Sequence, residues 1–308
     1  MKRKRRSFTV LAAVLIALIA LVSGCSNSTG ASSGKIIAVG AENEYADVIS
    51  QIGGKYVDVT GIMSNPETDP HTYEASTKDA STISKATLIV QNGLGYDDFM
   101  NKLEKGSPTS KRTVITVAQS LGYPDDTKNP HLWYKPDTMT RVASLVEKQL
   151  SKQMPGKKNY FKQRLQTFNH SLNGWYRELD HFKKAYGKTG VAVTEPVSDY
   201  LLQAGGLTIK TPWSFQASVM NGTDPSPQDV KTQQDLFTHK RVKVFLYNRQ
   251  AVDDATTALL KLAKSNKIPV VGVYETMPLH YHYQQWMEAE TKAIVRALKT
   301  GQSTESLN

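Results

Sequence analysis

Short apolar runs of strand length alternate with helical stretches along most of the chain, and this alternation restricts the fold more than any other feature. The expected strands cover residues 36–39, 57–63, 88–90, 113–117, 191–193, 242–246 and 269–273. The expected helices cover residues 45–52, a stretch from Thr77, and residues 97–103, 197–203, 254–265 and 286–298. Strands that alternate with helices through short turns predict parallel sheets with helices on both faces. The sequence therefore predicts an α/β protein with two Rossmann-like lobes.

A long helical stretch separates the two groups of strands. Residues 157–186 contain no proline and only one glycine. Their apolar side chains recur every three or four residues, at Leu165, Phe168, Leu172, Trp175, Leu179 and Phe182. This spacing is typical of an amphipathic helix, and about 30 residues at about 1.5 Å each span about 45 Å. We therefore expect one long, rigid helix to join an N-terminal lobe (35–156) to a C-terminal lobe (187–308).

The first 24 residues have the pattern of a secretory leader. Residues 2–6 are all Lys or Arg, and an apolar run broken only by Thr9 follows from residue 8 to 22. This run is shorter than the ~20 residues that a membrane-spanning helix needs. A basic start, a short apolar run and small residues predict a cleaved signal peptide at 1–24 and an exported protein.

Cys25 is the only cysteine, so the chain cannot form an internal disulfide. It directly follows Val22, Ser23 and Gly24, and this segment resembles a bacterial lipobox, in which the cysteine receives diacylglycerol. Two acyl chains are enough for stable anchoring. We therefore expect a mature chain that begins at a lipidated Cys25, with 25–34 as a flexible tether to the membrane.

The basic charge of the chain comes largely from the leader. The five basic residues at 2–6 account for half of the formal net charge of +10. The remaining Lys and Arg residues alternate with Asp and Glu along the expected helices, whereas nucleic-acid binding needs them gathered on one face. The composition therefore predicts no nucleic-acid partner.

Two of the seven histidines lie where an α/β protein builds its ligand sites. His71 and His131 each follow a proline, in the loops after the second and fourth expected strands. Ligands bind outside the carboxyl ends of strands in open α/β sheets, and proline stiffens such loops. Imidazole is the commonest metal ligand in proteins. The two Pro-His pairs therefore favour a shared metal site.

The motifs around these histidines resemble those of a known family. Residues 69–74 (Asp-Pro-His-Thr-Tyr-Glu), 88–95, 129–133 (Asn-Pro-His-Leu-Trp) and 274–278 (Tyr-Glu-Thr-Met-Pro) resemble the zinc- and manganese-binding solute-binding lipoproteins of ABC importers, the bacterial solute-binding protein 9 type. The resemblance covers nearly the whole mature chain. It implies two α/β lobes joined by a long helix, with the metal ion between the lobes.

The resemblance also implies four ligands, two from each lobe. His71 and His131 match the first two positions, and Glu195 matches the third, where relatives carry His or Glu. The fourth position is usually an aspartate after a late strand, and this sequence departs from that pattern. Glu275 is the acid best placed to substitute. The alternatives are Asp253, Asp254, His280 and His282.

The function implied by the resemblance is transport rather than catalysis. The expected protein is a monomer, lipid-anchored outside the cell membrane of a Gram-positive cell, that delivers Mn²⁺ or Zn²⁺ to an ABC permease and its ATPase. Glu195 at the third position, and the lack of histidine between His71 and His131, favour manganese. The general affinity order of such sites favours zinc, so the cargo stays open.

Three other functions compete with this interpretation. A binding protein for a metal chelate or another small solute would need an open cleft lined by aromatic or Arg side chains. An extracellular metallohydrolase would need three ligands, a water and a general base. The chain has no His-Glu-x-x-His motif. A surface adhesin role is left open by the sequence.

Overall fold

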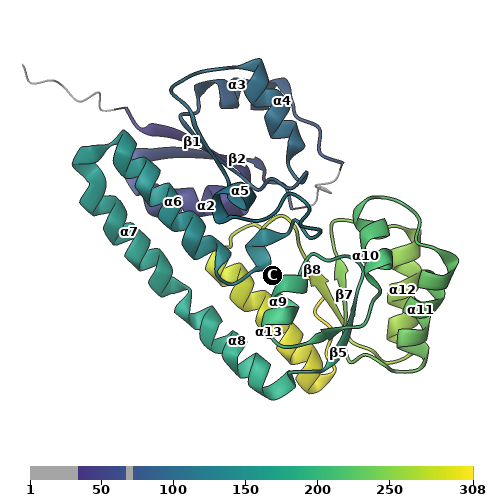
Figure 1. Cartoon of the computed structure of the whole chain (residues 1–308). Coiled ribbons are helices and arrows are strands. Elements are labelled where there is room, and N and C mark those ends of the chain that lie inside the picture. The colour runs from purple at the N-terminus through teal and green to yellow at the C-terminus, as the bar shows by residue number, and fades with distance from the viewer. Residues whose placement is uncertain (1–33, 67–71, 308) are drawn as a thin grey trace, which may run out of the picture. The chain divides into compact units, whose positions relative to one another are not determined.

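The computed structural model describes residues 34–66 and 72–307 (Figure 1). Its N-terminal lobe contains a parallel sheet with the strand order β2-β1-β3-β4. These strands are β1 (Ile36–Glu42), β2 (Val57–Met63), β3 (Leu88–Gln91) and β4 (Thr113–Thr116). The helices of this lobe are α2 (Asn43–Gly53), α3 (Thr77–Lys85), α4 (Asp98–Gly106) and α5 (Val117–Leu121).

The C-terminal lobe repeats this architecture with a second parallel sheet, in the order β6-β5-β7-β8. Its strands are β5 (Gly190–Val193), β6 (Thr208–Ile209), β7 (Phe245–Asn248) and β8 (Val270–Val273). Its helices are α9 (Asp199–Ala204), α10 (Trp213–Met220), α11 (Pro227–Thr238), α12 (Asp254–Ser265) and α13 (Tyr283–Thr300). The predicted pair of parallel α/β lobes is confirmed.

The helical connection between the lobes consists of two consecutive helices rather than one. Helix α6 (Thr138–Gln153) and a short 3-10 turn at Pro155–Lys157 lead into α7 (Lys158–Ser171), and α8 (Asn173–Tyr186) follows after Leu172. The Ser171 hydroxyl donates a hydrogen bond to the Phe168 carbonyl (2.7 Å), the acceptor that the Leu172 N–H would use in an uninterrupted helix. Hydroxyl groups that bond to a carbonyl of the preceding turn often bend helices, and the glycine two residues later weakens the helix further.

One apolar core runs through both lobes and along these helices. Trp175 of α8 packs edge-on against Tyr283 of α13, with 6.1 Å between ring centroids. Its indole N–H donates to the Thr291 hydroxyl (3.0 Å). Tyr134 and Trp286 continue the same buried cluster toward the N-terminal lobe. This packing holds α13, which starts beside α2, against the helical connection.

Some expectations fall on residues outside the described ranges. The leader, Cys25 and His71 are among them. In the part of the chain that the structure describes, no helix is long and apolar enough to cross a membrane.

Candidate metal centre

His131 lies in the loop after α5, immediately before the 3-10 turn at Leu132–Tyr134, and its side chain is fully buried. The Asn129 side-chain oxygen accepts from both the backbone N–H (3.0 Å) and the ring Nδ1 (2.8 Å) of His131. Since an amide oxygen can only accept, Nδ1 carries a proton, and Nε2 is the ring nitrogen left to bind a metal ion when the imidazole is neutral. Nε2 lies 3.2 Å from Glu275 Oε2. The imidazole therefore presents a metal-binding nitrogen toward a carboxylate.

Glu275 follows β8 and is also fully buried. The Tyr96 hydroxyl, from the N-terminal lobe, donates to its Oε2 (2.9 Å), and the Asn248 amide, at the end of β7, donates to its Oε1. The Gln250 side-chain oxygen accepts from the backbone N–H groups of Glu275 (2.6 Å) and Thr276 (2.9 Å). Groups from both lobes therefore fix this carboxylate against His131.

Glu195 lies just beyond β5, and only 2% of its surface is exposed. The next residue, Pro196, accepts a hydrogen bond through its carbonyl from the Asn129 side-chain N–H₂ (2.8 Å). The same Asn129 side chain holds His131 through its oxygen. Asn129 therefore joins the loops that carry His131 and Glu195 across the two lobes.

The structure thus brings together part of the predicted ligand set. His131 and Glu275 are in contact, and the Glu195 loop is tied to the His131 loop. Within residues 34–66 and 72–307, no three His, Cys, Asp or Glu side chains converge in the manner of a metal site. His71, the remaining predicted ligand, lies outside these ranges.

The alternatives to Glu275 have other positions and roles. Asp253 is the N-cap of α12 and accepts from the Thr256 N–H (2.7 Å), and Asp254 is exposed in the first turn of the same helix. The exposed His282 contacts Asp47 through Nδ1 (2.7 Å), and His280 is exposed. Glu275, the buried one of these five groups, is the best placed for a ligand.

Further buried acids surround the centre. Glu42 ends β1, Glu44 lies in the first turn of α2, and Asp97 precedes α4. Burial, together with the neighbouring carboxylates, raises the pKa of Glu42 and of Glu44 well above the ordinary value. Burial raises the pKa of Asp97 to about 6, although the N–H groups of Asn92 and Gly93 oppose the shift. A raised pKa favours the protonated form of these carboxyl groups, and a cation bound beside them would favour their ionised form.

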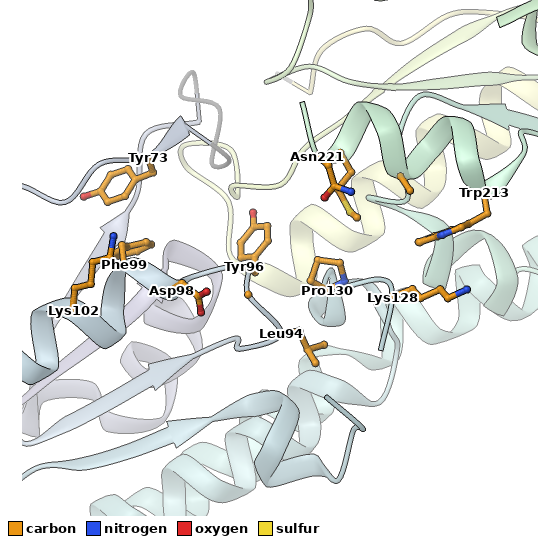
Figure 2. A pocket seen from close by; sticks show the side chains of 13 residues that line it. Tyr73, Leu94, Tyr96, Asp98, Phe99, Lys102, Lys128, Pro130, Trp213 and Asn221 are labelled. Carbon is orange, nitrogen blue, oxygen red and sulfur yellow. The ribbon is translucent and has the colours of Figure 1, made fainter. Parts of the chain in front are cut away.

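A cleft of about 680 Å³ lies directly beside this centre (Figure 2). Tyr73 and Phe99 of the N-terminal lobe line one side, and Trp213 of the C-terminal lobe lines the other. Tyr96, which contacts Glu275, and Pro130, which precedes His131, lie at its inner wall. The cleft therefore reaches direct neighbours of His131 and Glu275, although neither of these two buried residues lines it.

Comparison with known protein families shows which family the chain belongs to. The model of the family described as zinc-uptake complex component A, periplasmic (ZnuA), matches residues 39–297. The chain belongs to the ZnuA family. The manganese-binding lipoprotein MntA of Bacillus subtilis is 27% identical to this ZnuA-family chain over 271 residues, which cover 83% of the chain and 85% of MntA.

Two further proteins are similar to this ZnuA-family chain. The manganese ABC transporter substrate-binding lipoprotein PsaA of Streptococcus mitis is 24% identical over 272 residues, covering 83% of the chain and 85% of PsaA. The solved structure of the periplasmic zinc-binding protein TroA from Treponema pallidum has a TM-score of 0.73 at 19% identity, covering 87% of the chain and all of TroA. TroA therefore shares the fold.

Most residues that orient the centre of this ZnuA-family protein leave no pattern in the sequence. Tyr96, Asn248 and Gln250 act through contacts across 25 to 179 residues of sequence, which no local pattern reveals. Asn129 could be found from the sequence, because an amide side chain two residues before a candidate ligand can hydrogen-bond to that ligand.

Proposed function

We propose that this ZnuA-family protein captures one divalent transition-metal ion, Mn²⁺ or Zn²⁺, between its lobes and delivers it to an ABC permease driven by an ATPase. The buried contact between His131 Nε2 and Glu275 Oε2 is the observation that carries the proposal. Two atoms bound at about 2.1 Å to one tetrahedral ion lie about 3.4 Å apart. The observed separation of 3.2 Å is close to that value.

The proposed ligands are His71, His131, Glu195 and Glu275. Two carboxylates balance the charge of a divalent ion, and two imidazoles complete a set that suits both metals. The carboxylate oxygens favour Mn²⁺, whereas the general affinity order favours Zn²⁺. The names of MntA and PsaA, which refer to manganese, and of TroA, which refers to zinc, support this pair of cargoes.

The proposed setting is the outer face of the cell membrane. A diacylglycerol on Cys25 anchors the mature chain there, and 25–34 tethers the folded lobes, which act as a monomer. The relatives MntA and PsaA are named lipoproteins, which supports the anchor. The protein acts as a receptor rather than an enzyme, and the names of MntA and PsaA, which refer to metal binding and ABC transport, support this role.

Metal titration of single-histidine variants tests the proposal. His131→Ala and His71→Ala should each lower the affinity for Mn²⁺ and Zn²⁺ by orders of magnitude and leave the circular dichroism spectrum unchanged. The matched control is His170→Ala, which removes an exposed histidine of α7. Wild-type affinity should also fall as the pH drops toward about 6, because only neutral imidazole binds metal. Binding of one equivalent by either ligand variant, as tightly as by wild type, refutes the site.

A further inference from the structure

One face of α2 holds the segment that follows Glu275. Asn43, Asp47 and Gln51 are spaced four residues apart, so they lie on one face of the helix. Each of them is half-buried and bonds to the segment from Met277 to Gln284, more than 230 residues away in sequence. The N-terminal lobe is thus tied to the chain just beyond a proposed ligand from the C-terminal lobe.

The Asn43 tie is the one nearest the centre and consists of two bonds. Its side-chain N–H₂ donates to the Met277 carbonyl (2.8 Å), and its side-chain oxygen accepts from the Met277 N–H (2.9 Å). Both backbone groups of a single residue are therefore held by one amide. This arrangement fixes the position and orientation of the Met277 backbone relative to α2.

The other two ties lie farther along the helix. Asp47 accepts from the Tyr283 N–H (2.9 Å), and the amides of Gln51 and Gln284 bond to each other at 3.0 and 3.1 Å. Gln51 is eight residues beyond Asn43, which corresponds to about 12 Å along the helix. The Gln51 tie therefore joins the same two segments without touching the part next to Glu275.

Glu275 sits between two fixed points. Only Thr276 separates it from Met277, and the N–H groups of Glu275 and Thr276 are held by Gln250 of the C-terminal lobe. Asn43 fixes the far side of this short stretch to the N-terminal lobe, which also carries His131. Loss of the Asn43 tie frees one end of the stretch, so the carboxylate gains freedom relative to His131.

We propose that Asn43 is a positioning residue of the metal centre, which holds the Glu275 carboxylate against His131 by fixing Met277 to α2. The inference rests on the proposed function, because it takes Glu275 as a metal ligand. Outer partners of metal ligands are worth about 10- to 100-fold in affinity. Freedom of a ligand in the bound state shortens the lifetime of the complex, so the effect appears mainly in the dissociation rate.

The test compares Asn43→Ala with Gln51→Ala. Dissociation of Mn²⁺ is followed by transfer to an excess of a fluorescent chelator, and the melting temperature of the metal-free protein is measured beside it. Asn43→Ala should speed dissociation about 10- to 100-fold. Gln51→Ala should change it less than about threefold, although it also removes an inter-lobe amide pair. Asn43→Gln, which displaces the amide by one methylene, replaces the alanine variant if that variant does not fold. Equal effects of the two positions on dissociation, or none at Asn43, overturn the proposal.

A double-mutant cycle with Glu275→Gln shows whether Asn43 acts through Glu275. In the Glu275→Gln background, Asn43→Ala should change the affinity for Mn²⁺ less than about threefold, because the carboxylate that it positions is gone. A full Asn43 effect in that background overturns the positioning role and leaves the ligand set intact. If Glu275→Gln leaves the affinity for Mn²⁺ unchanged, Glu275 is not a ligand, and both the proposed ligand set and the positioning role of Asn43 are overturned.

Discussion

The Asn129→Ala substitution probes the link between the fold and the metal chemistry. It removes the acceptor for the His131 N–H and Nδ1, and the donor to the Pro196 carbonyl. Without the Asn129 oxygen, the His131 ring loses the bond that fixes its tautomer and orientation. Loss of such a partner typically weakens metal affinity by about 10- to 100-fold, which corresponds to about 1.4–2.8 kcal/mol. The three buried groups left without this partner also cost about 1–3 kcal/mol each unless water replaces the amide.

Two measurements separate these effects. Calorimetric or competitive titration gives the affinity for Mn²⁺, and thermal unfolding of the metal-free protein gives the stability. The control is Asn266→Ala, which removes an amide that bonds to the Leu262 carbonyl at the end of α12. This control should lower stability slightly and leave the affinity unchanged. If Asn129→Ala lowers the melting temperature but binds Mn²⁺ within about threefold of wild type, the positioning argument for His131 is wrong.

The remaining predictions concern the fourth ligand, a buried acid and the membrane anchor. Glu275→Ala should weaken Mn²⁺ binding at least about a hundredfold, because it removes a ligand and its charge. Asp253→Ala should leave Mn²⁺ binding unchanged and cost about 1 kcal/mol of stability, because it removes an N-cap. If titrations instead show weakened binding for Asp253→Ala and unchanged binding for Glu275→Ala, Glu275 is not the fourth ligand. Burial raises the pKa of Glu290 to about 8. The stability that its bound proton provides is complete below about pH 4 and is lost as the pH rises toward 8. Glu290→Gln should therefore reduce the fall in unfolding free energy between pH 5 and 8 by a few kcal/mol. Urea denaturation at a series of pH values measures this fall, and an equal fall in the two proteins rules the prediction out. Mass spectrometry of membrane-extracted protein should find diacylglycerol on an N-terminal Cys25, whereas a free thiol there excludes the anchor.

The pair of lobes was predictable because each strand is a short apolar run that a turn or a helix ends. The two-residue β6 is too short to leave such a pattern. The stretch that contains α10 and α11 has few apolar residues at helical spacing, although Ser226 and Pro227 form a readable helix start. The interruption at Leu172 coincides with the Ser171 hydroxyl bond, which the apolar spacing does not encode.

The candidate centre was partly predictable for the same reason. Glu275 closely follows β8, whereas α5 lies between β4 and His131, and the two side chains meet in the structure. The ties around them were not predictable, because Asn43, Tyr96 and Asn248 reach their partners across the lobes or between strands. The burial of Glu42 and Glu44 next to the centre was hidden as well, since acids at the end of a strand or the start of a helix are usually exposed.

Anomalous scattering from crystals of the mature protein, soaked with Mn²⁺ or Zn²⁺ and measured at the edge of each metal, locates the bound ion. We expect one peak, about 2.0–2.2 Å from His131 Nε2 and from carboxylate oxygens of Glu195 and Glu275. A fully loaded protein with no peak beside His131 and Glu275, or with its metal bound elsewhere on the surface, refutes the proposed metal site.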